Sequence, residues 1–341
     1  MVKAAKIFLW FLVAVVCLWQ LPYIWNFLSA KQQTTPFVLY SSIAKDFTIR
    51  RSVDNNSSWG IVNGEKLSRK EYDSLLPEYF AKQLASENRL PDTILSKPVS
   101  LKFLTDENIS FRVKPEAIFG PTIPLYQMLE SASGRVDLEM PPDVFRITDS
   151  KIEFINKDNN KINEDKSADF TEALKNANFA FPATEVSGNP SVKKKYDNGY
   201  LIVDSKDRLF NLKMVKDKPY IKRIAIPLGI TPKHCLVTEF SGKHSLGLFF
   251  DSKNELYNIM LPDYKVVKIE IPPVNLIEEE ITVMGNAFTW TIRVKNDEKI
   301  TWYAVDSQNF KLIKTYSENI EDNYVKGLSF EKNGWIDLGW R

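Results

Sequence analysis

Two acidic residues in the middle of the chain, Asp137 and Glu139, have the spacing of a candidate catalytic pair. On an extended strand, residues two apart point to the same side. Two carboxylates can divide acid and base roles in glycoside cleavage when their surroundings separate their pKa values. Such pairs also occur on ordinary sheet surfaces as salt-bridged faces. We expect residues 135–139 to form a strand whose open face carries Arg135, Asp137 and Glu139, with the intervening residues in the core.

Residues able to bind a metal ion are few and badly spaced. The two histidines are His234 and His244, and Cys235 follows the first. Zinc needs three or four ligands, and adjacent residues of a strand point apart. Residues 158–160 (Asp-Asn-Asn) resemble the start of a calcium loop, but Ile162 stands where a ligand is needed and the turn glycine is missing. We expect a hairpin turn at 158–160 and no metal site.

Sequence motifs of common enzymes are missing. The chain contains no G-x-S-x-G elbow, no Walker A loop and no G-x-G-x-x-G motif, so we expect no cofactor. Residues 31–341 carry 43 basic and 43 acidic side chains, because Lys3 and Lys6 are the only charged residues before them. A neutral body argues against nucleic acid as a partner, since that binding depends on an excess of Lys and Arg.

An apolar segment near the N-terminus predicts a membrane contact. Residues 7–28 are 22 positions without a charge, enough for a helix to cross a bilayer of roughly 30 Å at 1.5 Å per residue. The alternative is a cleaved signal peptide, which needs small residues before the cut. For cleavage after Ala30 or Ser29, the position two residues before the last residue of the signal peptide is Leu28 or Phe27. Both side chains are bulky where a small one is needed. We expect an uncleaved signal-anchor over residues 1–30.

The charges around this segment favour one orientation. Lys3 and Lys6 lie directly before it, and cations next to a span favour the cytoplasmic side. We expect a single-pass protein of the inner (cytoplasmic) membrane with a periplasmic body. Cys17 lies within the apolar segment and Cys235 far along the chain, so we expect no disulfide between them.

The pattern after a short tether predicts an α+β segment over residues 37–142. Residues 47–53 alternate as a strand does, and Ser68 with Glu71 has the spacing of a capping box that begins a helix at about Arg69. Pro77 can open the second half of that helix. Farther on, residues 103–113 have a strand-like pattern, and a short helix is expected near residues 125–131.

A repeated Asp-Ser step defines the region from residue 143 to 341. Each step stands between two hydrophobic strand patterns, where an Asp carboxylate can accept from its own backbone and close a hairpin. The four aspartates are Asp149, Asp204, Asp251 and Asp306. Their spacing, near 50 residues, is typical of propeller blades. We expect a blade-like, propeller-like antiparallel repeat region, with a plain sandwich or meander and an α+β form as alternatives.

Two further elements are expected in this region. Ser167 is the predicted N-cap of a helix over residues 168–179, with Phe170 and Leu174 on its apolar face. Residues 328–340 have the pattern of a fifth hairpin. The predicted fold class is therefore mainly β with a few helices: a transmembrane helix over 1–30, an α+β segment over 37–142 and the repeat region over 143–341.

Three stretches of the chain resemble an uncharacterised family of unknown function, comprising one-span envelope proteins of Gram-negative anaerobic bacteria. They are ESASGRVDLEMPPDVFRITDSKIEFINKDNNKINEDKSADFTEALK (130–175), TPFVLYSSIAKDF (35–47) and LSRKEYDSLLPEYF (67–80). The resemblance implies an accessory component found beside ABC-type transporters, and it supplies no catalytic residues. We expect a non-enzymatic envelope protein that binds a protein partner or a ligand. The alternative is an envelope hydrolase that acts on glycan or peptide through Asp137 and Glu139.

Overall fold

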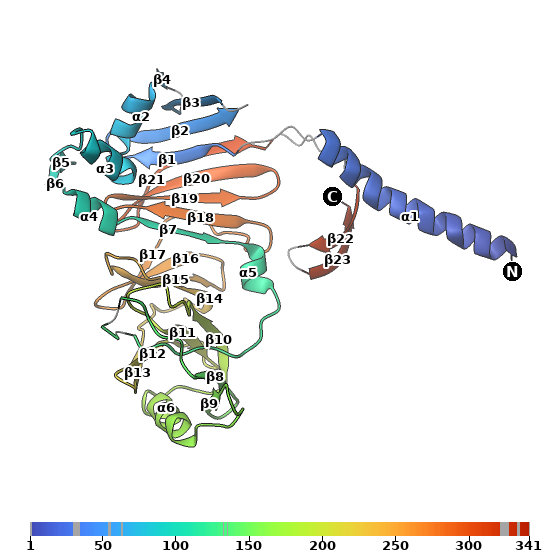
Figure 1. Cartoon of the computed structure of the whole chain (residues 1–341), viewed down its shortest axis with the longest axis vertical. Helices are drawn as coiled ribbons and strands as arrows, with labels where there is room; N and C mark the ends of the chain where they lie inside the picture. Colours follow the sequence, from blue (N-terminus) through green and yellow to red (C-terminus); the bar gives the residue numbers. More distant parts are fainter. Residues whose placement is uncertain are drawn as a thin grey trace.

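The computed structural model shows a column of antiparallel sheets, from which one long helix points away (Figure 1). The described residues are 2–29, 35–53, 56–62, 64–131, 133–134, 136–320, 327–332 and 335–340. The chain is mainly β, with an apolar N-terminal helix and several antiparallel sheets. The predicted fold class is confirmed.

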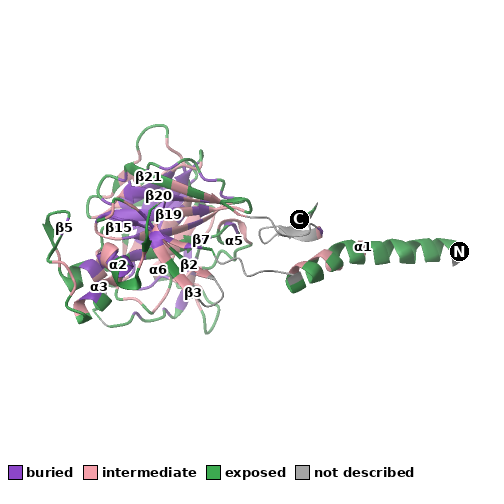
Figure 2. Cartoon of the chain, turned by 90° about the horizontal axis from the view of Figure 1, so that it is seen from above, coloured by how far each residue is buried: buried purple, intermediate pink, exposed green. Residues whose placement is uncertain are grey.

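The N-terminal helix α1 covers Val2–Ser29. The part of this helix from Lys3 to Leu28 is long and apolar enough to cross a membrane. None of the most apolar stretch within it is buried against the body. Figure 2 shows the helix exposed along nearly its whole length. Phe8 and Trp10 are 62% and 71% exposed. Water disfavours a continuous apolar surface of this size, so the helix needs a cover that the described body does not provide.

The first sheet follows α1 and ends at two short helices. Its strands, in spatial and chain order, are β1 (Phe37–Ser41), β2 (Asp46–Val53), β3 (Asn56–Ile61) and β4 (Lys66–Leu67). Helices α2 (Arg69–Leu75) and α3 (Pro77–Ser86) follow. The predicted capping box is confirmed: the Ser68 hydroxyl accepts from the Glu71 amide at 3.3 Å, and the Glu71 carboxylate accepts from the Ser68 amide at 2.8 Å.

The connecting segment differs from the sequence prediction in two places. It contains β5 (Thr93–Ile94), β6 (Lys97–Pro98), α4 (Leu101–Asp106), β7 (Ile109–Val113) and α5 (Pro115–Phe119). The strand predicted over 103–113 begins only at Ile109, because Ser100 caps α4 by accepting from the Phe103 amide. The prediction of a short helix near residues 125–131 was wrong. Tyr126 there exchanges backbone hydrogen bonds of 2.8 and 2.7 Å with Phe145, so the segment is extended.

A hairpin and a helix cap the far end of the column. They are β8 (Asp143–Ile147), β9 (Ile152–Asn156) and α6 (Glu164–Asn176). The predicted cap of α6 was wrong by one turn: Asn163 is the N-cap and accepts from the Lys166 amide at 3.1 Å. The Ser167 hydroxyl instead accepts from the buried Phe154 amide at 2.9 Å. The helix then begins with two acidic residues, Glu164 and Asp165, which are favourable at a helix N-terminus.

Three consecutive four-stranded meanders form the rest of the body. The first contains β10 (Ala183–Gly188), β11 (Tyr200–Asp204), β12 (Leu209–Val215) and β13 (Lys218–Arg223). The second contains β14 (Pro232–Val237), β15 (Ser245–Asp251), β16 (Leu256–Met260) and β17 (Lys265–Lys268). The third contains β18 (Glu280–Gly285), β19 (Thr289–Lys295), β20 (Lys299–Asp306) and β21 (Leu312–Asn319). Their uniform antiparallel order is the blade-like repeat that the sequence predicts.

The sheets pack face to face through separate apolar clusters. From one end of the column to the other, the order is β1–β4, β18–β21, β14–β17, β10–β13 and then the β8–β9 hairpin with α6 (Figure 1). Trp302, Phe249 and Phe210 are almost completely buried in three of these interfaces. Among the described residues, no apolar cluster joins the first sheet to the β8–β9 hairpin, so the stack is open rather than closed into a ring.

One strand crosses the boundary that the sequence predicts at residue 142. Strand β7 belongs to the 37–142 segment, yet it pairs with β18 as the fifth strand of the third meander. The first sheet also contacts that meander, where the Tyr40 amide donates to the Thr291 hydroxyl at 3.0 Å. The two predicted segments therefore share one sheet and one core.

Three of the four Asp-Ser steps close their hairpins in the same way. One carboxylate oxygen of Asp204, Asp251 and Asp306 accepts from the amide two residues on, at 2.9 Å in each case. The serine after each aspartate donates its amide to a backbone carbonyl group one to three residues before the strand that pairs with the aspartate's own strand, at 2.9–3.0 Å. In the fourth hairpin, the hydroxyl of Thr148 accepts from the amides of Ser150 and Lys151, and Asp149 is exposed.

The C-terminal hairpin is also formed. Strands β22 (Leu328–Lys332) and β23 (Trp335–Trp340) pair antiparallel, as predicted for residues 328–340. Figure 1 shows this hairpin beside α1 rather than on the column. At its start, a side chain in place of Gly327 would collide with Pro22 of α1. The hairpin therefore accompanies the apolar helix.

Candidate functional site

A cavity of about 680 Å³ lies between two neighbouring sheets of the column. Its walls are the first strands of those sheets, β10 and β14, and the segment 117–127 covers it. We call it the Glu185 cavity, after the only carboxylate among the described residues that line it. Its volume is within the range of small-molecule sites in proteins, about 300–1,000 Å³.

A bulge in each of the two strands directs a side chain toward this cavity. In β10, Ala183 pairs with Asp204 and Glu185 pairs with Val203, which leaves Thr184 as an extra residue. In β14, His234 likewise follows a bulge and pairs with the residue before Asp251. A bulge bends the strand and redirects its side chains. Glu185 and His234 therefore occupy equivalent positions in consecutive repeats, and both are among the residues that line the cavity.

Glu185 is a partly buried acid without a cationic partner in its surroundings. Burial raises the pKa of its carboxyl group, and the Cys235 amide, which donates to it at 3.4 Å, opposes this only weakly. Among the described residues that line the cavity, none is Lys or Arg. The carboxylate therefore has hydrogen-bonding capacity that the protein leaves unused.

The neighbouring cysteine and histidine are poorly suited to nucleophilic chemistry. Cys235 is buried, and burial together with the nearby Glu185 carboxylate raises the pKa of its thiol well above the usual value. Burial lowers the pKa of His234, helped by Lys233. The imidazole ring stands edge-on to Phe119, with 5.2 Å between ring centres. A protonated thiol beside a neutral imidazole lacks the thiolate that cysteine enzymes use.

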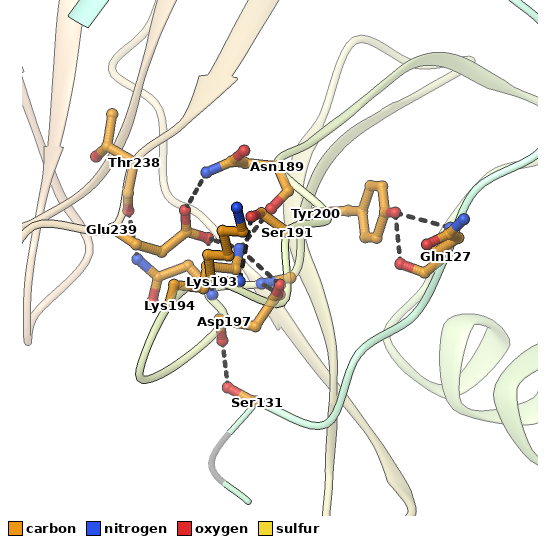
Figure 3. Close-up of polar contacts among 12 residues, drawn as sticks. Gln127, Ser131, Asn189, Ser191, Lys193, Lys194, Asp197, Tyr200, Thr238 and Glu239 are labelled. Atoms are coloured by element: carbon orange, nitrogen blue, oxygen red, sulfur yellow. Dashed lines mark hydrogen bonds and ion pairs between the residues drawn. The ribbon is translucent and has the colours of Figure 1, made fainter. Parts of the chain in front are cut away.

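Gln127 attaches the covering segment to β11 at the edge of the cavity. The Tyr200 hydroxyl donates to the Gln127 carbonyl at 2.7 Å and accepts from the Gln127 amide at 3.1 Å, which fixes the covering segment to β11 (Figure 3). The Gln127 side-chain oxygen is buried and has no partner among the described residues. Burying such an atom unpaired costs about 1–3 kcal/mol.

A buried ion cluster holds the loop that forms another wall. The Lys194 ammonium lies 2.9 Å from the Glu239 carboxylate and 2.8 Å from the Asp197 carboxylate (Figure 3). The three side chains are 11%, 2% and 4% exposed. Burial raises the pKa of Asp197, and Lys194 opposes the shift. The cluster joins the β10–β11 loop, which contributes Pro190 to the cavity, to the end of β14.

The candidate catalytic acids lie elsewhere. Asp137 and Glu139 are both exposed in an irregular segment, so the strand predicted over 135–139 was wrong. Val136, expected in the core, is 83% exposed. The positive φ of Gly134 and the prolines after residue 140 explain why no strand forms. Arg135 lies outside the described residues, and neither acid is among the residues lining the cavities found in the described part of the chain.

The other residues considered for metal binding are separated. His244 pairs with Glu107 at 3.0 Å and lines a different cavity from His234. Residues 157–159 form the predicted turn, in which the Asn156 side chain accepts from the amides of Asp158 and Asn159. Within the described ranges, no three His, Cys, Asp or Glu side chains are grouped closely enough to hold an ion.

A family model described as "Domain of unknown function (DUF4857)" matches residues 37–305. The chain belongs to the DUF4857 family. The match begins with β1 and ends in β20, so it includes the Glu185 cavity and crosses the boundary predicted at residue 142. A comparison with curated protein sequences gives no match.

Solved structures similar to this DUF4857 protein include two propeller domains. The β-propeller domain of Myceliophteria thermophila Cps50 (Swd1) is 11% identical, with a TM-score of 0.30, covering 62% of this chain and 63% of that chain. The WD40 domain of SCAP from fission yeast is 8% identical, with a TM-score of 0.33, covering 89% and 78%. Dihydro-heme d1 dehydrogenase NirN is 9% identical, with a TM-score of 0.26, covering 70% and 64%. Similarity at this level carries no information about ligands or activity.

Proposed function

We propose that this DUF4857 protein is a non-enzymatic binding or accessory component of an envelope complex, anchored by α1 in the inner membrane of a Gram-negative bacterium with its body in the periplasm. The observation that carries the proposal is the exposure of α1. Its apolar side chains have no cover in the described body, and a bilayer supplies the cover that they need. The C-terminal hairpin beside α1 would then lie near the membrane surface.

The Glu185 cavity supports binding rather than catalysis. It is formed between rigid sheets, it is large enough for a ligand, and its thiol is kept protonated by burial. Asp137 and Glu139 are exposed to water, whereas an acid–base pair depends on an enclosed setting to separate two pKa values. The envelope partner proposed from the family resemblance is an ABC-type transporter.

The anchor is tested by fractionation of cells that produce the full chain. We expect the protein to stay in the membrane pellet after carbonate and high-salt washing, because apolar burial is insensitive to ionic screening. Mass spectrometry should find residues 1–30 still attached. A mature protein that begins after residue 25 and leaves the pellet would show that α1 is a signal peptide.

The accessory role is tested by purification from mild detergent. We expect a membrane protein, with an ABC-type transporter as the proposed identity, to copurify in a fixed ratio. The hydrolase alternative is tested in parallel with peptidoglycan and peptide substrates. Turnover that disappears in both Asp137→Asn and Glu139→Gln, while the melting temperature is unchanged, would replace the binding proposal.

A further inference from the structure

The charge inside the Glu185 cavity has one sign. The titratable side chains among the described lining residues are Glu185, His234, Cys235, Tyr126 and Tyr200. Burial lowers the pKa of the imidazole and raises that of the thiol, and both changes favour the neutral form. Burial likewise raises the pKa of Tyr126. Glu185 is therefore the group on these walls that can present a charge to a ligand, and a cation beside it would oppose the burial that raises its pKa.

The hydrogen-bonding groups of the cavity call for a donor. Glu185 receives one long hydrogen bond of 3.4 Å, and the buried Gln127 side-chain oxygen has no partner within the described part of the chain. A ligand that donates to Glu185 would use its remaining acceptor capacity, whereas the Gln127 oxygen is too deeply buried for the ligand to reach. An ammonium or guanidinium group has several donors and a positive charge, and charge-assisted hydrogen bonds to a carboxylate are the stronger kind.

The remaining walls suit an apolar ligand body. Ile118, Leu125, Val186 and Leu236 line the cavity. Tyr126 adds an aromatic face, and such faces attract cations within about 6 Å of the ring centre. These apolar side chains share the lining with polar ones such as Thr122, Thr184 and Ser187, so the cavity can hold a ligand with both apolar and polar parts.

We propose that the Glu185 cavity binds a small organic cation, in which an ammonium or guanidinium group contacts Glu185 and an apolar body fills the space between β10 and β14. The inference rests on the proposed binding function and specifies its ligand class. The cation meets the carboxylate at the bulge of β10.

The two histidines give a direct test. His234 lines the cavity, whereas His244 lies at another sheet interface beside Glu107. The full chain in detergent, with isotope-labelled histidine, is titrated with benzylamine and, separately, with neutral benzyl alcohol of similar shape. We expect benzylamine to shift the His234 signals and to leave those of His244 in place. Benzyl alcohol should bind about tenfold more weakly or worse, because it lacks the charge.

Glu185→Gln is the decisive variant, because the amide keeps the shape of the side chain and can still accept from Cys235. We expect it to weaken benzylamine binding about tenfold and to leave benzyl alcohol binding unchanged. Glu78→Gln is the matched control, since Glu78 is also buried with an unpartnered oxygen but lines a different cavity. It should bind benzylamine as the natural protein does.

Two results would overturn this inference: equal binding of the amine and the alcohol, or unmoved His234 signals with both probes. Either result leaves the copurification of a membrane partner unaffected, so a wrong ligand class is distinguishable from a wrong function. Conversely, selective benzylamine binding without any copurifying partner would support the cavity and remove the proposed accessory role.

Discussion

The aspartates of the repeat are turn residues, and their different surroundings predict different costs of removal. Asp251 accepts from the amides of Lys253 and Glu255. Asp204 accepts from two such amides and also from the Ala180 amide and the Arg208 guanidinium. The Asp204 carboxylate therefore joins its own hairpin to a second chain segment at Ala180, whereas the Asp251 carboxylate closes only its own hairpin.

We expect Asp251→Ala to lower the free energy of unfolding by about 1–2 kcal/mol, the usual value for a side chain that caps backbone amides. Asp204→Ala should cost more, about 2–4 kcal/mol, because it also removes the acceptor of the partly buried Ala180 amide and the ion pair with Arg208. The control is Asp149→Ala, with less than about 0.5 kcal/mol, since Thr148 supplies the acceptor in that hairpin. Urea denaturation measures all three, and equal losses would contradict the assignment.

The contribution of Asp204 should also depend on pH. Burial raises the pKa of this carboxyl group, but the Arg208 guanidinium and the backbone amides lower it by more, so its pKa is below the usual value. A carboxyl group with a lowered folded-state pKa stabilises the fold above the unfolded pKa, about 3.9, and loses this effect as the pH falls through the folded value. The difference between the natural protein and Asp204→Ala should be constant from neutral pH to about pH 5 and shrink below about pH 4. A difference that grows on acidification would show the opposite shift.

Among the elements, helix α6 shows how a cap can be misplaced by sequence reasoning. Ser167 and Asn163 are both good capping residues, and either could begin the helix. In the structure Asn163 is the N-cap, because the Ser167 hydroxyl accepts a hydrogen bond from the Phe154 amide of the neighbouring hairpin. That requirement is a tertiary contact, which local sequence does not contain.

We expect Asn163→Ala to lower the free energy of unfolding by about 1 kcal/mol, because the Lys166 amide loses its acceptor. Glu172→Ala is the matched control on the exposed face of the same helix and should change stability by less than about 0.5 kcal/mol. Amide hydrogen exchange can locate the effect, with faster exchange confined to the first turn of α6 after Asn163→Ala. Unchanged exchange there would contradict the cap.

The elements that depend on interactions between residues close in the sequence were predicted correctly. The Ser68 capping box, the Asp-Ser hairpins and the strand over 47–53 all follow from contacts within a few residues, and all are present. The extended segment at Tyr126 depends instead on Phe145, which is distant in the chain, and the irregular segment at Asp137 combines the local effects of Gly134 and the prolines with a hydrogen bond from Leu138 to distant Val192. Periodicity alone therefore assigned both segments wrongly.

At the scale of the whole molecule, the candidate site is a product of sheet stacking. Glu185 and Gln127 are separated by 58 positions in the sequence and have no motif around them, so sequence analysis missed both. Glu185 and His234 are seen to be equivalent only when the two repeats are aligned on Asp204 and Asp251. Each then follows the bulge in the first strand of its sheet, β10 or β14. The repeat of Asp-Ser steps was the available signal, and it indicated which strands face each other without showing what they enclose.

The open stack also makes the first part of the chain dependent on the last. Val38, Tyr40 and Phe47 of the first sheet share an apolar cluster with Trp302 of β20. Strand β7 has β18 as its sheet partner, through five residue pairs from Ile281 to Gly285. A segment that ended at residue 142 would expose both surfaces to water, and domains that fold alone keep their own core.

We therefore expect the fragment 37–142 to lack a cooperative thermal transition when it is produced by itself. Produced together with the fragment 143–341, it should form a stable complex, because β7 and the first sheet regain their partners. Trp302→Ala in the longer fragment should weaken the complex, because large-to-alanine changes in a core cost about 3–5 kcal/mol. The matched control is Trp340→Ala, since Trp340 is 58% exposed and belongs to the hairpin beside α1. A cooperative transition and dispersed NMR signals from 37–142 alone would show that residue 142 does end an independent domain, and that the contacts with β18 and β20 are dispensable for its folding.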